Sequence, residues 1–264
     1  MITVIGLGEV GEPTFRDIAL KVGKSHVCGV DINKKIVSKL KKEGYIVTQK
    51  SNCISKVYII CVSIPSEDLS GLFKVFEDNL KRSTSKILIS IESTVPPLKI
   101  NEIVSKLDEL LGDYYLVFFP HRFFKRDNNH RVFNLNRVIA GLNNESLKEG
   151  IKFYSRFMER MLIHPVSNLT TAAICKTAEN TYRYIEISFA EELKMLCDFK
   201  KINFIELREA MNTKWNINIK EARAGIKGHC LTKDSNFFNS FFSKKSKFIK
   251  TAKLVNNKYT KRII

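Results

Sequence analysis

Apolar residues in the first part of the chain form short runs that alternate with longer segments of helical periodicity. Strand-like runs occupy residues 2–5, 26–30, 57–62, 86–91, 115–119, 138–140 and 161–163. Helical patterns occupy residues 10–22, 34–43, 69–80, 98–111 and 145–158. The run at 57–62 is continuously apolar, as in a strand that is buried on both faces. This alternation predicts an α/β fold with a doubly wound parallel sheet.

The pattern changes in the second part of the chain, where apolar residues follow helical spacing only. Residues 168–199 contain neither proline nor glycine, and they predict one long helix of the kind that links domains or forms dimer interfaces. Further helices are expected near residues 204–211 and 247–264. We therefore predict an α/β domain over residues 1–165 and an all-helical domain over residues 166–264.

Composition describes an ordinary globular protein of 264 residues, with 44% hydrophobic and 27% charged residues. No apolar run reaches the length of a membrane span, and no signal peptide opens the chain. We expect a cytoplasmic protein that does not interact with membranes.

The net charge of +17 raises the question of nucleic-acid binding. The lysines are spread along the chain, and no basic motif is interleaved with aromatic residues. We therefore predict no nucleic-acid partner. Solvated lysine-rich faces, or attraction of anionic small molecules such as nucleotides, account for the charge instead.

The cysteines are scattered and form no C-x-x-C pair. They are Cys28, Cys53, Cys61, Cys175, Cys197 and Cys230. Buried free thiols in a reducing compartment are expected for all of them except Cys230, and no metal site is predicted.

A dinucleotide-binding fingerprint stands near the start of the chain. Residues 6–11 read Gly-Leu-Gly-Glu-Val-Gly, directly after a strand and at the start of a helix, and Asp31 ends the next strand. Gly6 permits the tight turn, Gly8 lets the backbone approach a pyrophosphate, and Gly11 allows close packing of the helix on the sheet. Asp31 would accept hydrogen bonds from ribose hydroxyls and repel a 2′-phosphate, which favours NAD over NADP. The alternative is a glycine turn beside a surface aspartate.

A reactive cysteine is the second chemical feature. Residues 228–234 read Gly-His-Cys-Leu-Thr-Lys-Asp, so that Cys230 stands close to cationic side chains that would favour its thiolate. A thiol in a chain that also binds a nicotinamide suggests oxidation through a covalent thio-intermediate, which carries an alcohol to the acid. Lys176 and Asn180 share one helix face and could stabilise an oxyanion or orient a water. Their alternative roles are a solvated lysine and a helix-packing asparagine.

Seven segments together resemble the UDP-sugar 6-dehydrogenases, a family that includes the UDP-glucose and UDP-N-acetylhexosamine dehydrogenases. The segments are residues 6–11, 31–33, 61–65, 92–97, 137–141, 175–183 and 228–234. The pairs Glu179-Asn180 and His229-Cys230 are most similar to the UDP-N-acetylmannosamine dehydrogenase branch. The resemblance implies a Rossmann domain followed by a helical central domain.

The same resemblance implies NAD-dependent oxidation of a nucleotide sugar, a UDP-N-acetylhexosamine or UDP-glucose, at C6 to the uronic acid. The catalytic residues that it implies are Cys230, Lys176, Asn180, Asp234, Thr94 and His121. The cofactor-binding residues that it implies are Gly6, Gly8, Val10, Gly11, Asp31, Val62 and Thr94. Two alternatives stay open: Thr94 could cap the turn before Pro96, and Asp234 could cap a helix that begins at Ser235.

The chain departs from the family pattern in two ways. His121 stands where the family usually has a glutamate that acts as a base, so it either takes over that role, leaves hydrolysis impaired, or contacts a phosphate from a loop. The family also carries a third domain that binds the uridine nucleotide, and the sequence stops near the helix that would lead into it. A separate UDP-binding subunit, a smaller substrate or a degenerate protein would each account for that.

Two other functions compete with this hypothesis. A β-hydroxyacid dehydrogenase has the same plan and a helical lysine–asparagine pair, but it uses no cysteine nucleophile. An NAD-binding partner subunit without full activity would suit the substitution at His121. Whichever dehydrogenase activity the chain has, the long helix over residues 168–199 favours a homodimer.

Overall fold

The computed structural model describes residues 1–51, 54–80, 86–123 and 129–263. The chain divides into two compact units, Met1–Lys176 and Thr177–Ile264, which we call the sheet unit and the helical unit. The division between the two units falls within one long helix, Leu169–Lys200. The domain division expected at residues 165 and 166 stays a prediction.

The sheet unit contains one eight-stranded sheet with the order β3-β2-β1-β4-β5-β6-β7-β8. Its strands are β1 Ile2–Ile5, β2 Val27–Val30, β3 Ile46–Thr48, β4 Val57–Ile60, β5 Ile87–Ile91, β6 Tyr114–Phe118, β7 Arg137–Gly141 and β8 Ile163–Pro165. Every pair is parallel except β6 and β7. The described residues between those two strands contain no helix, and a parallel pair would need a crossover connection, usually a helix. The predicted doubly wound fold is confirmed, with one antiparallel pair added.

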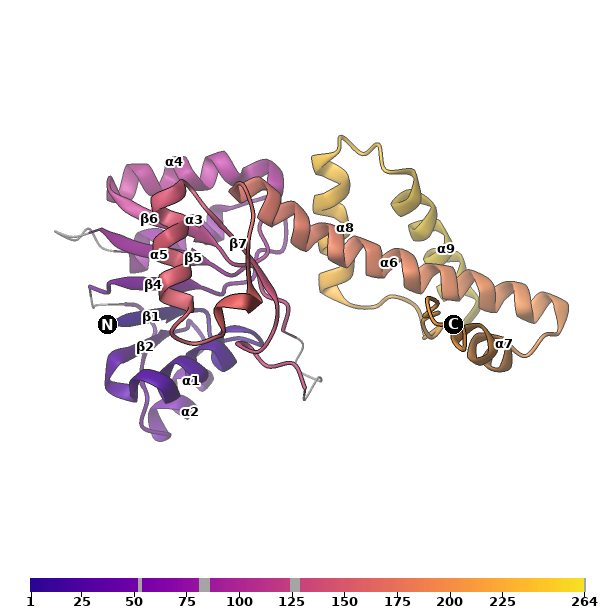
Figure 1. The fold of residues 1–264 in the computed structure, drawn as a ribbon, viewed down its shortest axis with the longest axis horizontal. Helices are drawn as coiled ribbons and strands as arrows, with labels where there is room; N and C mark the ends of the chain where they lie inside the picture. Colours follow the sequence, from indigo (N-terminus) through magenta and orange to yellow (C-terminus); the bar gives the residue numbers. More distant parts are fainter. Residues whose placement is uncertain (52–53, 81–85, 124–128, 264) are drawn as a thin grey trace. The chain divides into compact units, whose positions relative to one another are not determined.

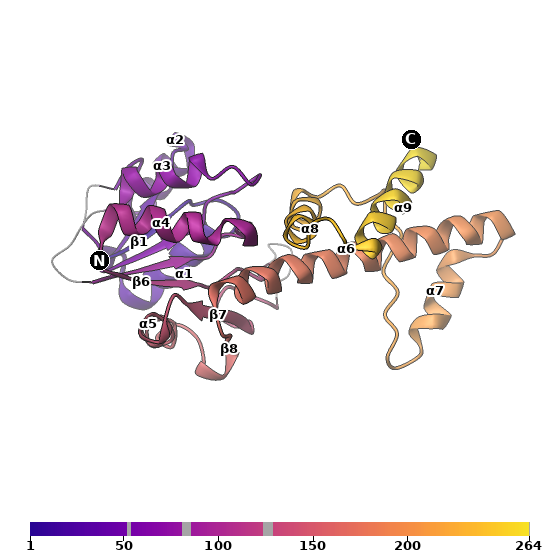
Figure 2. The ribbon, with the colours of Figure 1, turned by 90° about the horizontal axis from the view of Figure 1, so that it is seen from above.

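Helices cover both faces of this sheet, which explains why its strands read as continuous apolar runs. One core layer packs α3 (Ser70–Asn79) and α4 (Ile100–Leu111) against the sheet. The other packs α1 (Gly11–Val22), α2 (Lys34–Lys42) and α5 (Asn144–Tyr154). Figure 2 shows α3 and α4 on one side of the sheet and α5 on the other.

The helical unit contains the larger part of α6 (Leu169–Lys200), the long helix that crosses Figure 1, together with three further helices. These are α7 (Phe204–Asn212), α8 (His229–Phe241) and α9 (Lys247–Ile263). Its apolar contacts form two small clusters, one around Tyr184 and Ile249 and one around Ala190 and Phe204. Two small clusters in place of one large core leave several apolar side chains of α6 exposed.

The observed elements differ from the predicted ones at a few boundaries. Strand β3 was not predicted, because it is a short edge strand of three residues. Helix α5 ends at Tyr154, before the predicted end at residue 158. The predicted strand at 161–163 falls instead on a short 3-10 turn, Arg160–Leu162, and the strand follows at Ile163–Pro165.

Candidate functional site

The carboxyl ends of the parallel strands lie at one edge of the sheet. The register aligns Ile5 with both Val30 and Ile60, Ile60 with Ile91, and Ile91 with Phe118. The strand order reverses direction between β1 and β4, so the loops that follow these two strands diverge there. In open α/β sheets this point forms the crevice in which dinucleotides bind.

The glycine loop after β1 is shaped as a close-packed turn with an open outer side. Gly6 has a φ of +86°, and a Cβ on Gly11 would lie 1.8 Å from the carbonyl oxygen of Gly6. A Cβ on Gly8, by contrast, would meet nothing within 4 Å. Gly6 and Gly11 are therefore required by the fold itself, whereas Gly8 leaves its backbone open to a ligand. This is the arrangement that a pyrophosphate needs at a helix N-terminus.

Two further predicted cofactor residues lie beside this loop. The carboxylate of Asp31 accepts hydrogen bonds from the backbone N–H of Leu7 at 2.6 Å and of Asn33 at 2.7 Å. Val62 lies on the other side, and its Cγ1 would be 3.1 Å from a Cβ on Gly6. The glycine loop, the acidic group and the apolar wall together fit a dinucleotide with free ribose hydroxyls.

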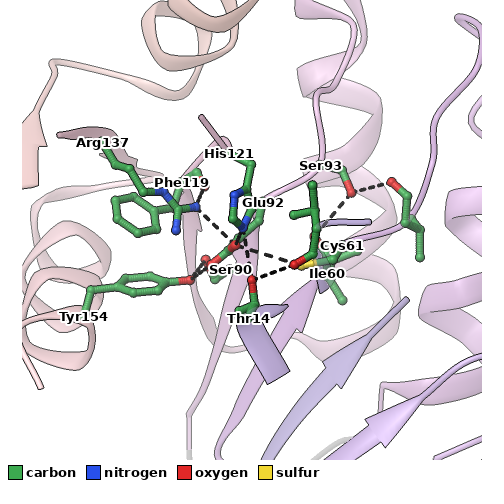
Figure 3. Close-up of polar contacts among 12 residues, drawn as sticks. Thr14, Ile60, Cys61, Ser90, Glu92, Ser93, Phe119, His121, Arg137 and Tyr154 are labelled. Atoms are coloured by element: carbon green, nitrogen blue, oxygen red, sulfur yellow. Dashed lines mark hydrogen bonds and ion pairs between the residues drawn. The ribbon is translucent and has the colours of Figure 1, made fainter. Parts of the chain in front are cut away.

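A buried polar cluster lies at the same edge of the sheet and centres on Glu92, the residue directly after β5. The Glu92 carboxylate is 2.7 Å from His121 Nε2 and 3.1 Å from Arg137 Nη2, and it accepts a hydrogen bond from the Tyr154 hydroxyl at 2.7 Å. Figure 3 shows these side chains converging on the carboxylate from different elements. We call Glu92, His121, Arg137 and Tyr154 the Glu92 cluster. It brings together residues that are distant in the sequence.

Charge balance explains how a carboxylate remains ionised in this core. Burial by itself would raise the pKa of Glu92, but Arg137 and His121 together with the hydrogen bonds lower it to about 2. Arg137 is fully buried as well, and it donates to the backbone oxygen of Phe119 while its guanidinium carbon lies 3.6 Å from the centroid of the Phe119 ring. Paired burial of this kind stabilises neither ion strongly, but removing one partner would leave the other uncompensated.

His121, the expected base, lies inside the Glu92 cluster and is 6% exposed. Burial and the positive charge of Arg137 lower the pKa of His121 to about 4, despite the opposing effect of Glu92. Lys176 contributes a smaller part of the same shift, which puts these two predicted catalytic residues within electrostatic range of each other. His121 is therefore a neutral imidazole near neutral pH.

Thr94 and Lys176 are the remaining predicted site residues of the sheet unit, and Cys61 lies beside the Glu92 cluster. Thr94 is half-buried in the segment after β5, and Lys176 is half-buried on α6. The thiol of Cys61 donates toward Glu92 at 3.9 Å, and burial together with that carboxylate raises the pKa of Cys61. Cys61 is therefore held as a neutral thiol and does not suit a nucleophile.

The helical unit brings two of its predicted catalytic residues into direct contact. The Asn180 amide on α6 donates to Asp234 Oδ2 on α8 at 2.5 Å, and Lys233 Nζ lies 3.3 Å from Asp234 Oδ1. Asp234 is 1% exposed. Helix α8 begins at His229 with Gly228 as its N-cap, so the alternative role of Asp234 as a helix cap is wrong.

Cys230 is exposed in the first turn of α8, four residues before Asp234. Residues four apart share one face of a helix, so the thiol and the buried aspartate lie on the same side of α8. The other cysteines divide as follows: Cys28 and Cys197 are buried, Cys61 and Cys175 are half-buried, and Cys53 lies outside the described residues. The prediction that all thiols except Cys230 are buried is confirmed for Cys28 and Cys197 and is correct only in part for Cys61 and Cys175.

Comparison with known proteins identifies the helical part of the chain. The model of the UDP-glucose/GDP-mannose dehydrogenase family, central domain, matches residues 170–258. This chain carries a UDP-glucose/GDP-mannose dehydrogenase family domain. The matched range includes α8 and most of α6, the two helices that hold Asn180, Cys230 and Asp234.

Relatives of this family domain match almost the whole chain. A UDP-N-acetyl-D-mannosamine dehydrogenase of Methanocaldococcus jannaschii is 29% identical over 97% of this chain and 65% of its own length. A UDP-D-ManNAc dehydrogenase from Pyrococcus horikoshii superposes with a TM-score of 0.84 at 28% identity, over 98% of this chain and 69% of the other. A 3-hydroxyisobutyrate dehydrogenase from Mycobacterium tuberculosis, at 12% identity and a TM-score of 0.71 over 98% of this chain and 92% of the other, shares the fold alone. The chain spans 65% of the length of two methanogen relatives that it matches, and up to 71% of other curated relatives.

The sequence pattern had not singled out several buried polar residues. Glu92 and Arg137 lie in segments that carried the family resemblance, but neither was assigned a role, and Tyr154 was placed only within a helix. Glu191, on α6, is buried as well. Glu92 directly after a buried strand was the one signal that could have found the cluster, because polar residues at strand ends gather at one edge of a parallel sheet.

No group of three or more His, Cys, Asp or Glu suited to a metal ion occurs among the residues that the structure describes. In the same described ranges, no helix has both the length and the apolar character needed to cross a bilayer.

Proposed function

We propose that this protein binds NAD and oxidises the C6 hydroxyl of a UDP-sugar, with a UDP-N-acetylhexosamine as the first candidate, to the uronic acid. The observation that carries the proposal is the buried Asn180–Asp234 pair next to an exposed Cys230 on α8. The glycine loop supports the proposed NAD binding, because the space beside the Gly8 backbone is open to a ligand. The similarity to UDP-N-acetyl-D-mannosamine dehydrogenases supports the substrate class.

Gly6, Gly8, Val10 and Gly11 would hold the pyrophosphate of NAD, and Asp31 would hold its ribose. Val62 and Thr94 would supply further contacts to the cofactor. When bound, NAD supplies the acceptor for hydride, twice for each sugar that goes from alcohol to acid.

The residues of the chain would carry the other steps. After the first oxidation, the Cys230 thiolate adds to the aldehyde carbon, and the oxygen takes up a proton to give a thiohemiacetal. The second oxidation leaves a thioester, whose acyl carbon is attacked by water, and the carbon–sulfur bond breaks to release the acid and the thiol. Lys176 and Asn180 would stabilise the oxyanions, while Asp234 orients Asn180. Thr94 would hydrogen-bond the substrate or the water, and His121 acting as the base stays a prediction.

The long helix supports a homodimer as part of the same proposal. Tyr182, Phe189 and Leu196 recur at intervals of seven residues on α6 and are 64%, 48% and 58% exposed. An apolar stripe with this spacing on a long helix is typical of a helix–helix interface.

The test is a turnover screen with NAD over UDP-N-acetylmannosamine, UDP-N-acetylglucosamine and UDP-glucose. We expect two NADH per sugar, and we expect Cys230→Ser to form no acid while it still binds NAD. Cys175→Ser is the control, because it removes another partly exposed thiol. Acid production by Cys230→Ser at the wild-type rate would refute the mechanism. NAD binding without turnover of any sugar would leave the partner-subunit alternative.

The β-hydroxyacid dehydrogenase alternative is weaker, because the likeness to such an enzyme extends to the fold alone. It also leaves the exposed thiol of Cys230 without a role. A β-hydroxyacid included in the same screen distinguishes the two activities directly.

A further inference from the structure

His121 connects the Glu92 cluster to the glycine loop. Its Nε2 lies 2.7 Å from Glu92 Oε2 and 3.1 Å from the hydroxyl of Thr14, a fully buried residue of α1. The Thr14 hydroxyl in turn donates to the backbone oxygen of Val10 at 3.0 Å. Val10 is the last residue before α1 begins. A continuous chain of polar contacts therefore runs from the end of β5 to the loop that would hold the pyrophosphate.

The directions of these bonds are determined by the neighbours. The Thr14 hydroxyl donates its hydrogen to the backbone oxygen of Val10, so the Thr14 oxygen must accept a hydrogen bond from His121 Nε2. The Glu92 carboxylate can only accept. Both requirements are met when the single proton of a neutral His121 lies on Nε2 and is shared between the two oxygens. His121 Nδ1 then carries the lone pair, and it has no hydrogen-bond partner in the described parts of the chain.

We propose that His121 is a positioning residue of the dinucleotide site, which holds the start of α1 and the glycine loop in place through Thr14. The inference rests on the proposed NAD binding and assigns to His121 a role other than the base. The loop is sensitive to such support, because α1 begins in a closely packed turn: a Cβ on Gly11 would lie 1.8 Å from the Gly6 oxygen and 2.9 Å from Cys61 Cβ. A small outward movement of α1 would displace the N–H groups that face the pyrophosphate.

The burial of His121 favours this role over direct chemistry. The accessible area of Nδ1 is below 1 Å², so a water or substrate atom has no access to the lone pair. The single proton on Nε2 is already shared between the Glu92 and Thr14 oxygens. A general base must lie within hydrogen-bond reach of the proton that it takes, and neither nitrogen meets that condition here.

The test measures NAD affinity by isothermal titration, with no sugar present, together with the KM for NAD and kcat. His121→Phe removes both nitrogens, whereas His121→Gln keeps an N–H that reaches Glu92 and Thr14. Thr14→Val removes the hydroxyl, and Thr14→Ser keeps it. Thr3→Val is the matched control, because Thr3 is another fully buried threonine, hydrogen-bonded to Ser55 at 2.7 Å.

We expect His121→Phe and Thr14→Val each to raise the Kd for NAD about tenfold, the size of effect that one lost hydrogen bond produces. The double variant should bind no more weakly than either single variant, because both break the same chain of contacts. His121→Gln, Thr14→Ser and Thr3→Val should bind NAD as the wild type does, and His121→Gln should keep kcat.

Loss of acid formation in His121→Gln with an unchanged Kd for NAD would assign His121 as the base and overturn the proposal. A wild-type Kd in Thr14→Val would overturn it as well. Wild-type protein that does not bind NAD at all would instead refute the proposed function. If His121→Phe fails to fold, the Thr14 pair and His121→Gln still decide the question.

Discussion

Glu191 on α6 should make the stability of the helical unit depend on pH. Its side chain is fully buried, and neither carboxylate oxygen has a hydrogen-bond partner among the residues described. The hydroxyl of Ser188, one turn earlier on α6, is likewise unsatisfied. Burial raises the pKa of Glu191 to about 7, and its charge acts on Tyr184 and Tyr259, the titratable groups near it. Burial is the cause of the shift, and among the residues that the structure describes no cation offsets the charge of an ionised Glu191.

The sign of the effect follows from the two pKa values. The folded-state pKa of about 7 lies above the ordinary value of 4.5, so the folded protein keeps a proton that the unfolded chain releases. The stabilisation is therefore complete below pH 4.5 and is lost as the pH rises through 7. The whole shift corresponds to about 3 kcal/mol, at about 1.4 kcal/mol per pKa unit. Relaxation and water penetration around a buried carboxylate reduce this, and we expect about 2 kcal/mol.

The assay is urea unfolding of the full chain followed by far-ultraviolet circular dichroism at several pH values. Glu191→Gln removes the titration, so its free energy of unfolding relative to wild type should rise by about 2 kcal/mol between about pH 4 and about pH 8. Any constant offset from the buried amide cancels in that comparison. Glu192→Gln, an exposed neighbour on the same helix, should show no such rise. A difference between Glu191→Gln and wild type that does not change with pH would refute the reasoning.

Further predictions concern the sheet unit. Gly11→Ala should destabilise the protein by about 3 kcal/mol and abolish NAD binding, because its Cβ would lie 1.8 Å from the Gly6 oxygen. Gly8→Ala should fold normally, since its Cβ meets nothing within 4 Å, but it should bind NAD more weakly. Urea unfolding measures the stability of both variants, and titration with NAD measures their affinity. Acid should unfold the sheet unit, because the pKa values of His121 and Glu92 lie at about 4 and about 2 in the folded protein against ordinary values of 6.5 and 4.5. The sheet unit then loses stability as the pH falls through the pKa values of these two groups. A circular dichroism spectrum that stays unchanged down to pH 2 would contradict this prediction.

Local pattern was sufficient to predict the edge of the sheet that carries the glycine loop. Short apolar runs specify the strands, and the fingerprint specifies a turn whose glycines have distinct steric roles. The structure confirms those steric roles for Gly6 and Gly11 and leaves Gly8 open. The positive φ of Gly6 and the close approach of Gly11 to the Gly6 oxygen are local to the fingerprint, so a single sequence predicts them. The close approach of Cys61 to both glycines, by contrast, comes from the end of the neighbouring strand β4.

The Glu92 cluster could not be predicted in the same way. Its members come from the ends of different strands and from α5, and each one alone has an ordinary surface or loop explanation. Only the pairing of β6 with β7 brings Arg137 beside Glu92. The antiparallel pairing of β6 with β7 was not predicted from the sequence either. The burial of His121 could not be predicted for the same reason, since it depends on Glu92 and Thr14, partners that are distant in the sequence.

Helical periodicity predicted the extent of α6 closely but did not predict which of its residues are buried. Tyr182, Phe189 and Leu196 follow the apolar spacing and are exposed, while the polar residues Asn180 and Glu191 are buried. Hydrophobicity alone cannot distinguish a face that packs inside the chain from one that is left for a partner. Asn180 is buried because Asp234 satisfies its amide, and that contact joins two helices.

Glu92 and Glu191 show how surroundings determine the behaviour of chemically identical groups. Both are fully buried, yet the cations and donors around Glu92 lower its pKa whereas the apolar surroundings of Glu191 raise its own. The sheet unit therefore loses stability toward acid, and the helical unit loses stability above neutral pH. Because the two dependences run in opposite directions, the unit that unfolds first should change with pH. If His121 supports the glycine loop as proposed, that loop should then fail first in acid, and the helix that carries Cys230 should fail first in alkali.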